Sequence, residues 1–100
     1  MKYIRRRYIL VYSNENISKN ILLSALKQKI IELFGAFGIQ KSGLSAFKID
    51  EHFFIVRSTS NFVDDVLFAL ATIKMQNIKF LSIRISGTIK KLIGLLKEIS

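Results

Sequence analysis

Residues 84–91 of this sequence combine the residue types that most readily bind an anion. An alternating apolar run ends there and a helically spaced apolar run begins, with Ser86, Gly87 and Thr88 between the two. Serine or threonine can cap the first free N–H groups of a helix, and glycine reaches backbone angles closed to other residues. Helix N-termini attract anions, and here an arginine precedes and two lysines follow. The stretch predicts either a phosphate-binding helix start or a well-capped turn with solvated lysines.

Residues suited to catalysis are few in this chain. It has one histidine and no cysteine, which excludes disulfides, thiolate nucleophiles and zinc–thiolate sites. Asp64 and Asp65 are adjacent on a predicted helix, where they complement the helix dipole rather than share a metal ion. His52 follows Asp50 and Glu51 in a predicted hairpin turn, and consecutive turn residues rarely converge on a metal. We therefore predict that the chain is not an enzyme by itself and binds no cofactor or metal of its own.

Length and charge limit the classes of protein to which this chain can belong. One hundred residues suit a single domain spanning residues 1–100. The net charge of +9 favours binding to nucleic acid or an anionic surface, and an apolar content of 50% excludes disorder. The longest uncharged apolar run, residues 66–73, is too short to cross a bilayer, and we recognise no signal peptide. The expectation is a cytoplasmic protein without membrane contact.

Hydrophobic periodicity predicts the order β-α-β-β-α-β followed by one more helix. We expect strands at residues 3–12, 44–50, 53–58 and 78–86, and helices at residues 17–34 and 88–99. Between them, residues 59–61 offer N-caps for a further helix that ends at about residue 75. Short connections and right-handed crossovers make this an α+β, ferredoxin-like (RRM-like) sandwich with an extra C-terminal helix. In that fold two helices cover one face of a four-stranded antiparallel sheet, and the first and third strands are central.

The face of the sheet without helices is predicted to carry Phe53, Phe80, Arg57 and Arg84. Many RNA-binding domains of this topology stack bases on that face, although the third strand here lacks the RNA-recognition signature. The strands are apolar on both faces, so the face that lacks helices must also be covered. We expect a partner protein or a second copy of the chain to bind on this face or near residues 35–38, unless the last helix covers the face. Two alternatives stay open: an RRM-like single-stranded RNA binder and a structural protein–protein module.

An ordered set of short motifs runs through almost the whole chain. It consists of residues 5–10 (RRRYIL), 33–38 (LFGAFG), 55–57 (IVR), 68–73 (FALATI) and 86–90 (SGTIK). In this set and in its basic charge, the chain resembles the archaeal ribonuclease P protein component 2 family.

The resemblance implies a non-catalytic protein subunit of the ribonucleoprotein that removes 5′ leaders from precursor tRNA. In that family RNA is the catalyst and uses Mg²⁺. The implied partners are the catalytic domain of the ribonuclease P RNA and protein component 3, with precursor tRNA as substrate of the complex, self-association as a further expectation, and an archaeal source. Together with the charge pattern, the resemblance predicts that the following residues contact RNA: Lys2, Arg5, Arg6, Arg7, Arg57, Arg84, Ser86, Gly87, Thr88, Lys90 and Lys91.

Overall fold

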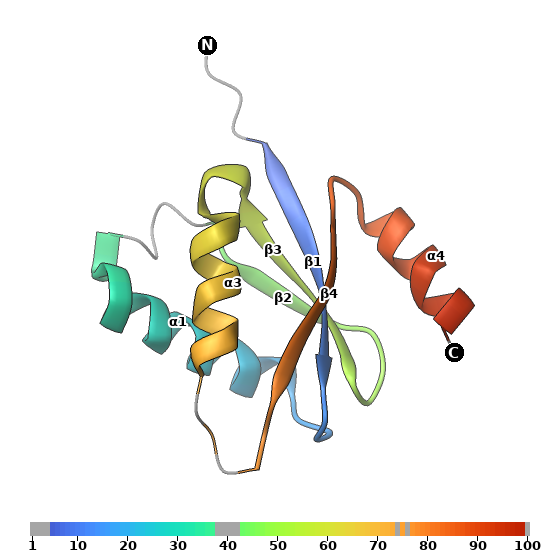
Figure 1. Cartoon of the computed structure of the whole chain (residues 1–100), viewed down its shortest axis with the longest axis horizontal. Coiled ribbons are helices and arrows are strands. Elements are labelled where there is room, and N and C mark those ends of the chain that lie inside the picture. Colours follow the sequence, from blue (N-terminus) through green and yellow to red (C-terminus); the bar gives the residue numbers. More distant parts are fainter. Residues whose placement is uncertain (1–4, 38–42, 74, 76, 100) are drawn as a thin grey trace.

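The computed structural model describes residues 5–37, 43–73, 75 and 77–99. The predicted order of elements is confirmed (Figure 1). The strands are β1 (Arg6–Ser13), β2 (Ser45–Lys48), β3 (Phe53–Thr59) and β4 (Phe80–Ser86), and the helices are α1 (Lys19–Phe34), η1 (Ser60–Phe62), α3 (Val63–Thr72) and α4 (Ile89–Ile99). The largest difference from the predicted bounds is at residues 59–75, where a 3₁₀ turn precedes a shorter α-helix.

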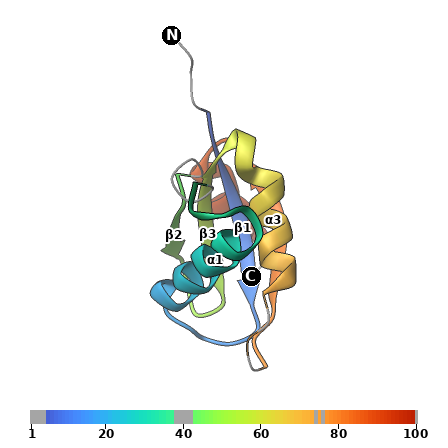
Figure 2. The same cartoon turned by 90° about the vertical axis from the view of Figure 1, so that its left-hand side faces the viewer.

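The four strands form one antiparallel sheet in the order β2-β3-β1-β4. The predicted central position of the first and third strands is thus confirmed, and so is the ferredoxin-like fold. Helices α1 and α3 lie side by side on one face of the sheet (Figure 2). The main core lies between these helices and the sheet, where Ile9, Val11, Phe54 and Val56 are buried. These four residues alternate along β1 and β3, which is why they share a face.

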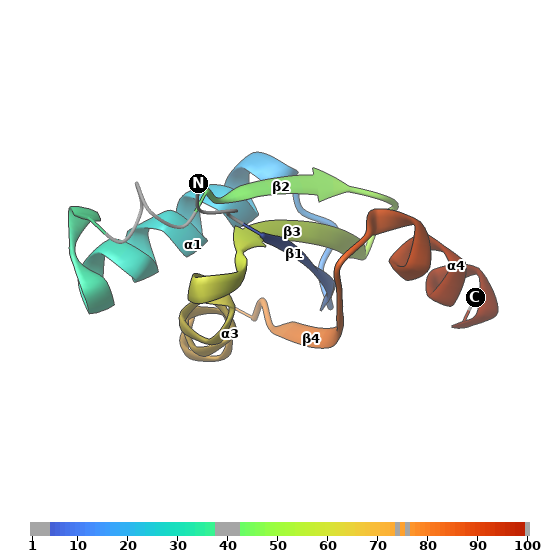
Figure 3. The same ribbon diagram turned by 90° about the horizontal axis from the view of Figure 1, so that it is seen from above.

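Helix α4 packs on the opposite face of the sheet (Figure 3). Leu92 is fully buried there against Leu10 and Ile55, and Ile89 and Leu95 pack around this second cluster. Because side chains alternate along a strand, Leu10 points away from the main core and needs this separate cover. The prediction of a face without helices is wrong, and the stated alternative, that the last helix packs on this face, is confirmed.

The position of Phe80 also differs from the prediction. The pairing of β1 with β4 shifts between Leu10 and Val11, so that Leu10 lies opposite Arg84 whereas Val11 lies opposite Ser82. The irregularity places one extra residue in β4. The side chains in the first half of β4 therefore point to the opposite face from the one that strict alternation predicts. Phe80 therefore packs against the main core, while the other three predicted members of its face lie on the α4 side.

Both ends of α1 are fixed by local chemistry. The Ser18 hydroxyl accepts a hydrogen bond from the Ile21 N–H at 3.3 Å, which caps the N-terminus. Gly35 ends the helix with φ 79° and ψ 173°, and its N–H donates to the Ile31 carbonyl. Only glycine adopts these angles readily, so the predicted helix stop at Gly35 is confirmed.

We expect Gly35→Ala to lower the free energy of unfolding by about 1–3 kcal/mol, because alanine strains the backbone at these angles. The matched control is Gly94→Ala within α4, where an added Cβ meets no atom within 4 Å. This control should instead raise stability by about 0.5–1 kcal/mol, since glycine is the poorer helix former. Urea unfolding of both variants measures the difference, and effects of the same sign would contradict the assigned helix end.

Candidate nucleic-acid interface

One end of the sheet gathers most of the predicted RNA-binding residues. It is formed by the start of β1, the ends of β3 and β4, and the start of α4. Tyr8 lies opposite Arg57 on one side and Ser86 on the other, so these three residues form a row on the α4 side of the sheet. Arg6 lies opposite Thr59 on the same side. We call this region the basic end.

Arg7 is on the α1 and α3 side of the basic end, opposite Ser58. Its Nη1 atom lies 3.0 Å from the point that a Cβ at position 87 would occupy. Gly87 does not use the backbone angles that only glycine reaches readily, because the described glycines with positive φ are Gly35 and Gly43. Glycine at position 87 instead leaves room for the Arg7 guanidinium, and a larger residue there would displace it.

The turn before α4 is ordered by Ser86. Its hydroxyl accepts a hydrogen bond from the Thr88 N–H at 3.2 Å. Lys90 and Lys91 follow in the first turn of α4, and both are exposed. The structure thus brings residues 86–91 and the Arg7 side chain together at a single helix start.

Three predicted residues lie elsewhere or cannot be placed. Arg84 is opposite Leu10, two residues before the basic end on the outermost strand. Arg5 directly precedes β1, and its carbonyl accepts a hydrogen bond from the Ser60 N–H at 2.8 Å. Lys2 lies outside the described residues.

The arginines of this region form no salt bridge with a described residue. Within the described ranges the only salt bridge joins Lys29 and Glu32 on α1, at 3.7 Å. All five arginines of the chain are described, so each of them is without a carboxylate partner in this part of the protein. Unpaired guanidinium groups in a chain of charge +9 attract phosphate strongly.

Sequence reasoning missed two residues beside Arg57. Tyr8 is its neighbour on β1, and Ser45 is its neighbour on β2. The Ser45 Oγ and the Arg57 Nε are both buried without a hydrogen-bond partner. An aromatic residue directly after three arginines was a usable signal for Tyr8, whereas nothing in the sequence pattern indicated Ser45.

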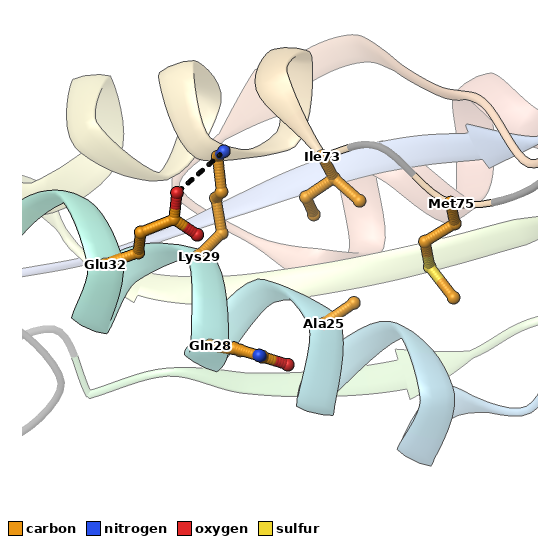
Figure 4. Close-up of a pocket in the computed structure, with 6 residues that line it drawn as sticks. All are labelled: Ala25, Gln28, Lys29, Glu32, Ile73 and Met75. Carbon is orange, nitrogen blue, oxygen red and sulfur yellow. Dashed lines mark ion pairs between the residues drawn. The ribbon is translucent and has the colours of Figure 1, made fainter.

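A hollow between α1 and the segment after α3 has none of the features of a catalytic site. Its volume is about 340 Å³, and its lining residues are Ala25, Gln28, Lys29, Glu32, Ile73 and Met75 (Figure 4). Among these lining residues Glu32 is the only carboxylate, and it is paired with Lys29, so they provide no free acid–base pair. Among the described residues no three acidic, histidine or cysteine side chains lie close enough together to hold a metal ion. None of the described helices combines the length and hydropathy needed to cross a bilayer.

Comparison with known proteins places the chain in a family. The sequence model of the Rpp14/Pop5 family, a ribonuclease P family, matches residues 6–94. A search of curated protein sequences gave no match. Among solved structures, a chain in the cryo-EM structure of yeast ribonuclease MRP is similar, with a TM-score of 0.70 and 11% sequence identity. The alignment covers 98% of this chain and 95% of that chain, and at this identity it shows the fold alone. Since the family match spans nearly all of the sequence, the chain belongs to the Rpp14/Pop5 family of ribonuclease P proteins.

Proposed function

We propose that this protein is a non-catalytic subunit of ribonuclease P that supports the catalytic RNA in removing 5′ leaders from precursor tRNA. Membership of the Rpp14/Pop5 family is the main support. The observation that carries RNA binding is the basic end, whose arginines have no carboxylate partner among the described residues. In this proposal RNA carries out the reaction with its own Mg²⁺, and the protein supplies positive charge.

Each part of the basic end has its own role in this proposal. Arg7, Lys90 and Lys91 contact RNA phosphates at the start of α4, and the exposed Arg5 and Arg6 extend this contact along the start of β1. The 86–88 turn keeps that helix start beside Arg7. Arg57 contributes from the neighbouring strand, on the same face as Arg6.

An RRM-like mode of binding is less well supported by the structure. Phe53, the aromatic residue expected to stack on bases, packs against the cluster of Leu10, Ile55 and Leu92. Helix α4 therefore occupies part of the surface that a stacked base would need. We infer that RNA contact runs through phosphates at the basic end rather than through bases on the sheet.

A protein partner has a separate surface available at the end of α1. Residues 31–37 are all exposed, and Ile31, Leu33, Phe34 and Phe37 are the large apolar side chains among them. Phe37 is 73% exposed. In Figure 1 this end of α1 and helix α4 lie on opposite sides of the sheet. Protein component 3 is the partner that we propose for this apolar surface, with a second copy of the chain as the competing occupant.

Reconstitution tests the proposed function. The RNA, component 3 and precursor tRNA are combined at limiting Mg²⁺, with and without this protein. We expect the protein to raise the rate of leader cleavage or to lower the Mg²⁺ concentration that cleavage needs, and the protein without RNA to cleave nothing. Cleavage by the pure protein would contradict a non-catalytic role. If the protein binds component 3 but changes neither RNA affinity nor cleavage, a purely structural module is the better description.

A further inference from the structure

The outer edge of β4 is unusually apolar for an open sheet edge. β4 is the last strand in the order β2-β3-β1-β4, so among the described residues only its inner edge is paired with another strand. Every residue from 81 to 85 is exposed, and Leu81, Ile83 and Ile85 are 62%, 36% and 42% exposed. The opposite edge strand, β2, has only four residues against seven in β4. Long apolar edges are templates for pairing with another strand, and proteins usually shorten, charge or cover them.

The apolar side chains of β4 extend over both faces of this edge. Leu81 lies opposite Tyr12 and therefore on the α4 side. Ile83 and Ile85 line a shallow hollow of about 230 Å³ together with Leu67 of α3. A strand added at this edge would thus find apolar contacts on the α3 side.

The charge of β4 and of the residues around it indicates which kind of molecule binds this edge. Residues 77–91 contain four lysine or arginine residues and no aspartate or glutamate, and Arg84 lies in the middle of β4. A second copy would bring the same cations to the same place and be repelled. RNA offers neither apolar side chains for Ile83 and Ile85 nor a peptide backbone for the unpaired edge groups.

We propose that the outer edge of β4 binds an extended acidic and apolar segment of a partner protein, which adds a fifth strand to the sheet. Alternate residues of such a segment face Ile83 and Ile85 on one side and Arg84 on the other, because side chains in a strand alternate. The backbone supplies hydrogen bonds, the apolar residues fill the hollow beside Leu67, and the acidic residues neutralise Arg84.

Two synthetic peptides test the proposal on the full chain: seven residues of alternating valine and glutamate, and the same peptide with lysine in place of glutamate. Peptide is added up to about 1 mM, and amide hydrogen exchange is followed by NMR. The glutamate peptide should slow exchange at alternate amides of residues 80–86, and the lysine peptide should not. Equal effects of both peptides, protection on another element, or no binding of either would overturn the proposal.

Variants separate this surface from the RNA surface. Replacing Ile83 and Ile85 together with serine should weaken glutamate-peptide binding by at least about tenfold, while Ile93→Ser, equally exposed on α4, should leave it unchanged. Arg84→Gln should remove the preference for glutamate over lysine, which tests the same edge without touching its apolar residues. Affinity for RNA should be unchanged in the double serine variant, and a loss of RNA affinity there would overturn the assignment of this edge to a protein.

Discussion

Replacing Arg5, Arg6 and Arg7 together with alanine is expected to weaken RNA binding severely and to flatten its salt dependence. If each arginine contacts one phosphate, the slope of log affinity against log salt becomes shallower by about 2–3, at roughly 0.7–0.9 per contact. The loss is largest at low salt, because counterion release contributes most there. Filter binding or fluorescence anisotropy at several salt concentrations measures the slope directly.

A charge-matched control distinguishes specific contact from net charge. Lys19, Lys27 and Lys79 lie on α1 and just before β4, away from the basic end, and their triple alanine variant has the same net charge as the arginine variant. We expect this control to retain most of the affinity and nearly all of the slope. Equal losses in the two triple variants would mean that RNA responds only to total charge and that the basic end is not a site.

Leu92→Ala is expected to lower the free energy of unfolding by about 2–5 kcal/mol. Leu92 is fully buried, and it is the α4 residue at the centre of the second cluster, against Leu10 and Ile55. Truncation leaves a cavity where α4 meets the sheet, beside Ile89 and Leu95. Chemical denaturation monitored by circular dichroism gives the value.

The neighbouring residue provides the control for this variant. Ile93 is on the same helix and is 37% exposed, so Ile93→Ala should change stability by clearly less than Leu92→Ala. Similar effects of the two substitutions would contradict the packing of α4 described above. RNA affinity in the Leu92 variant, measured where the protein is still folded, also shows whether Lys90 and Lys91 need α4 held on the sheet.

The fold was predictable because its elements are locally consistent. Strand and helix periodicities, Gly35 at the end of α1, and the order of connections all point to one topology. Two features were not predictable from periodicity. The pairing irregularity between Leu10 and Val11 depends on how β1 meets β4, and it moves Phe80 to the other face. Whether the second face of the sheet is buried depends on where α4 packs, and no local sequence pattern determines that position.

The candidate site was predictable in composition but not in geometry. The sequence shows one group of basic residues in the first strand and another around residues 84–91. The pairing of β1 with β4 explains why these two groups lie close together. Arg7 and Gly87 are eighty positions apart, so their proximity could not be found from an argument about local backbone angles at the glycine. The neighbours of Arg57 likewise come from two other strands and could be found only from the register.

The position of β1 in the sheet has a consequence for how the chain is made. β1 is synthesised before the other strands of the sheet, yet it is a central strand whose neighbours, β3 and β4, begin at Phe53 and Phe80. At about 5–20 residues per second, β1 waits roughly 2–9 s for β3 to be completed, and longer for β4. During this interval Ile9, Leu10 and Val11, all fully buried in the finished protein, have no strand to pair with. The basic end joins the first strand of the sheet to the last, so it is complete only after Ser86 has left the ribosome and forms later than the pairing of β1 with β3.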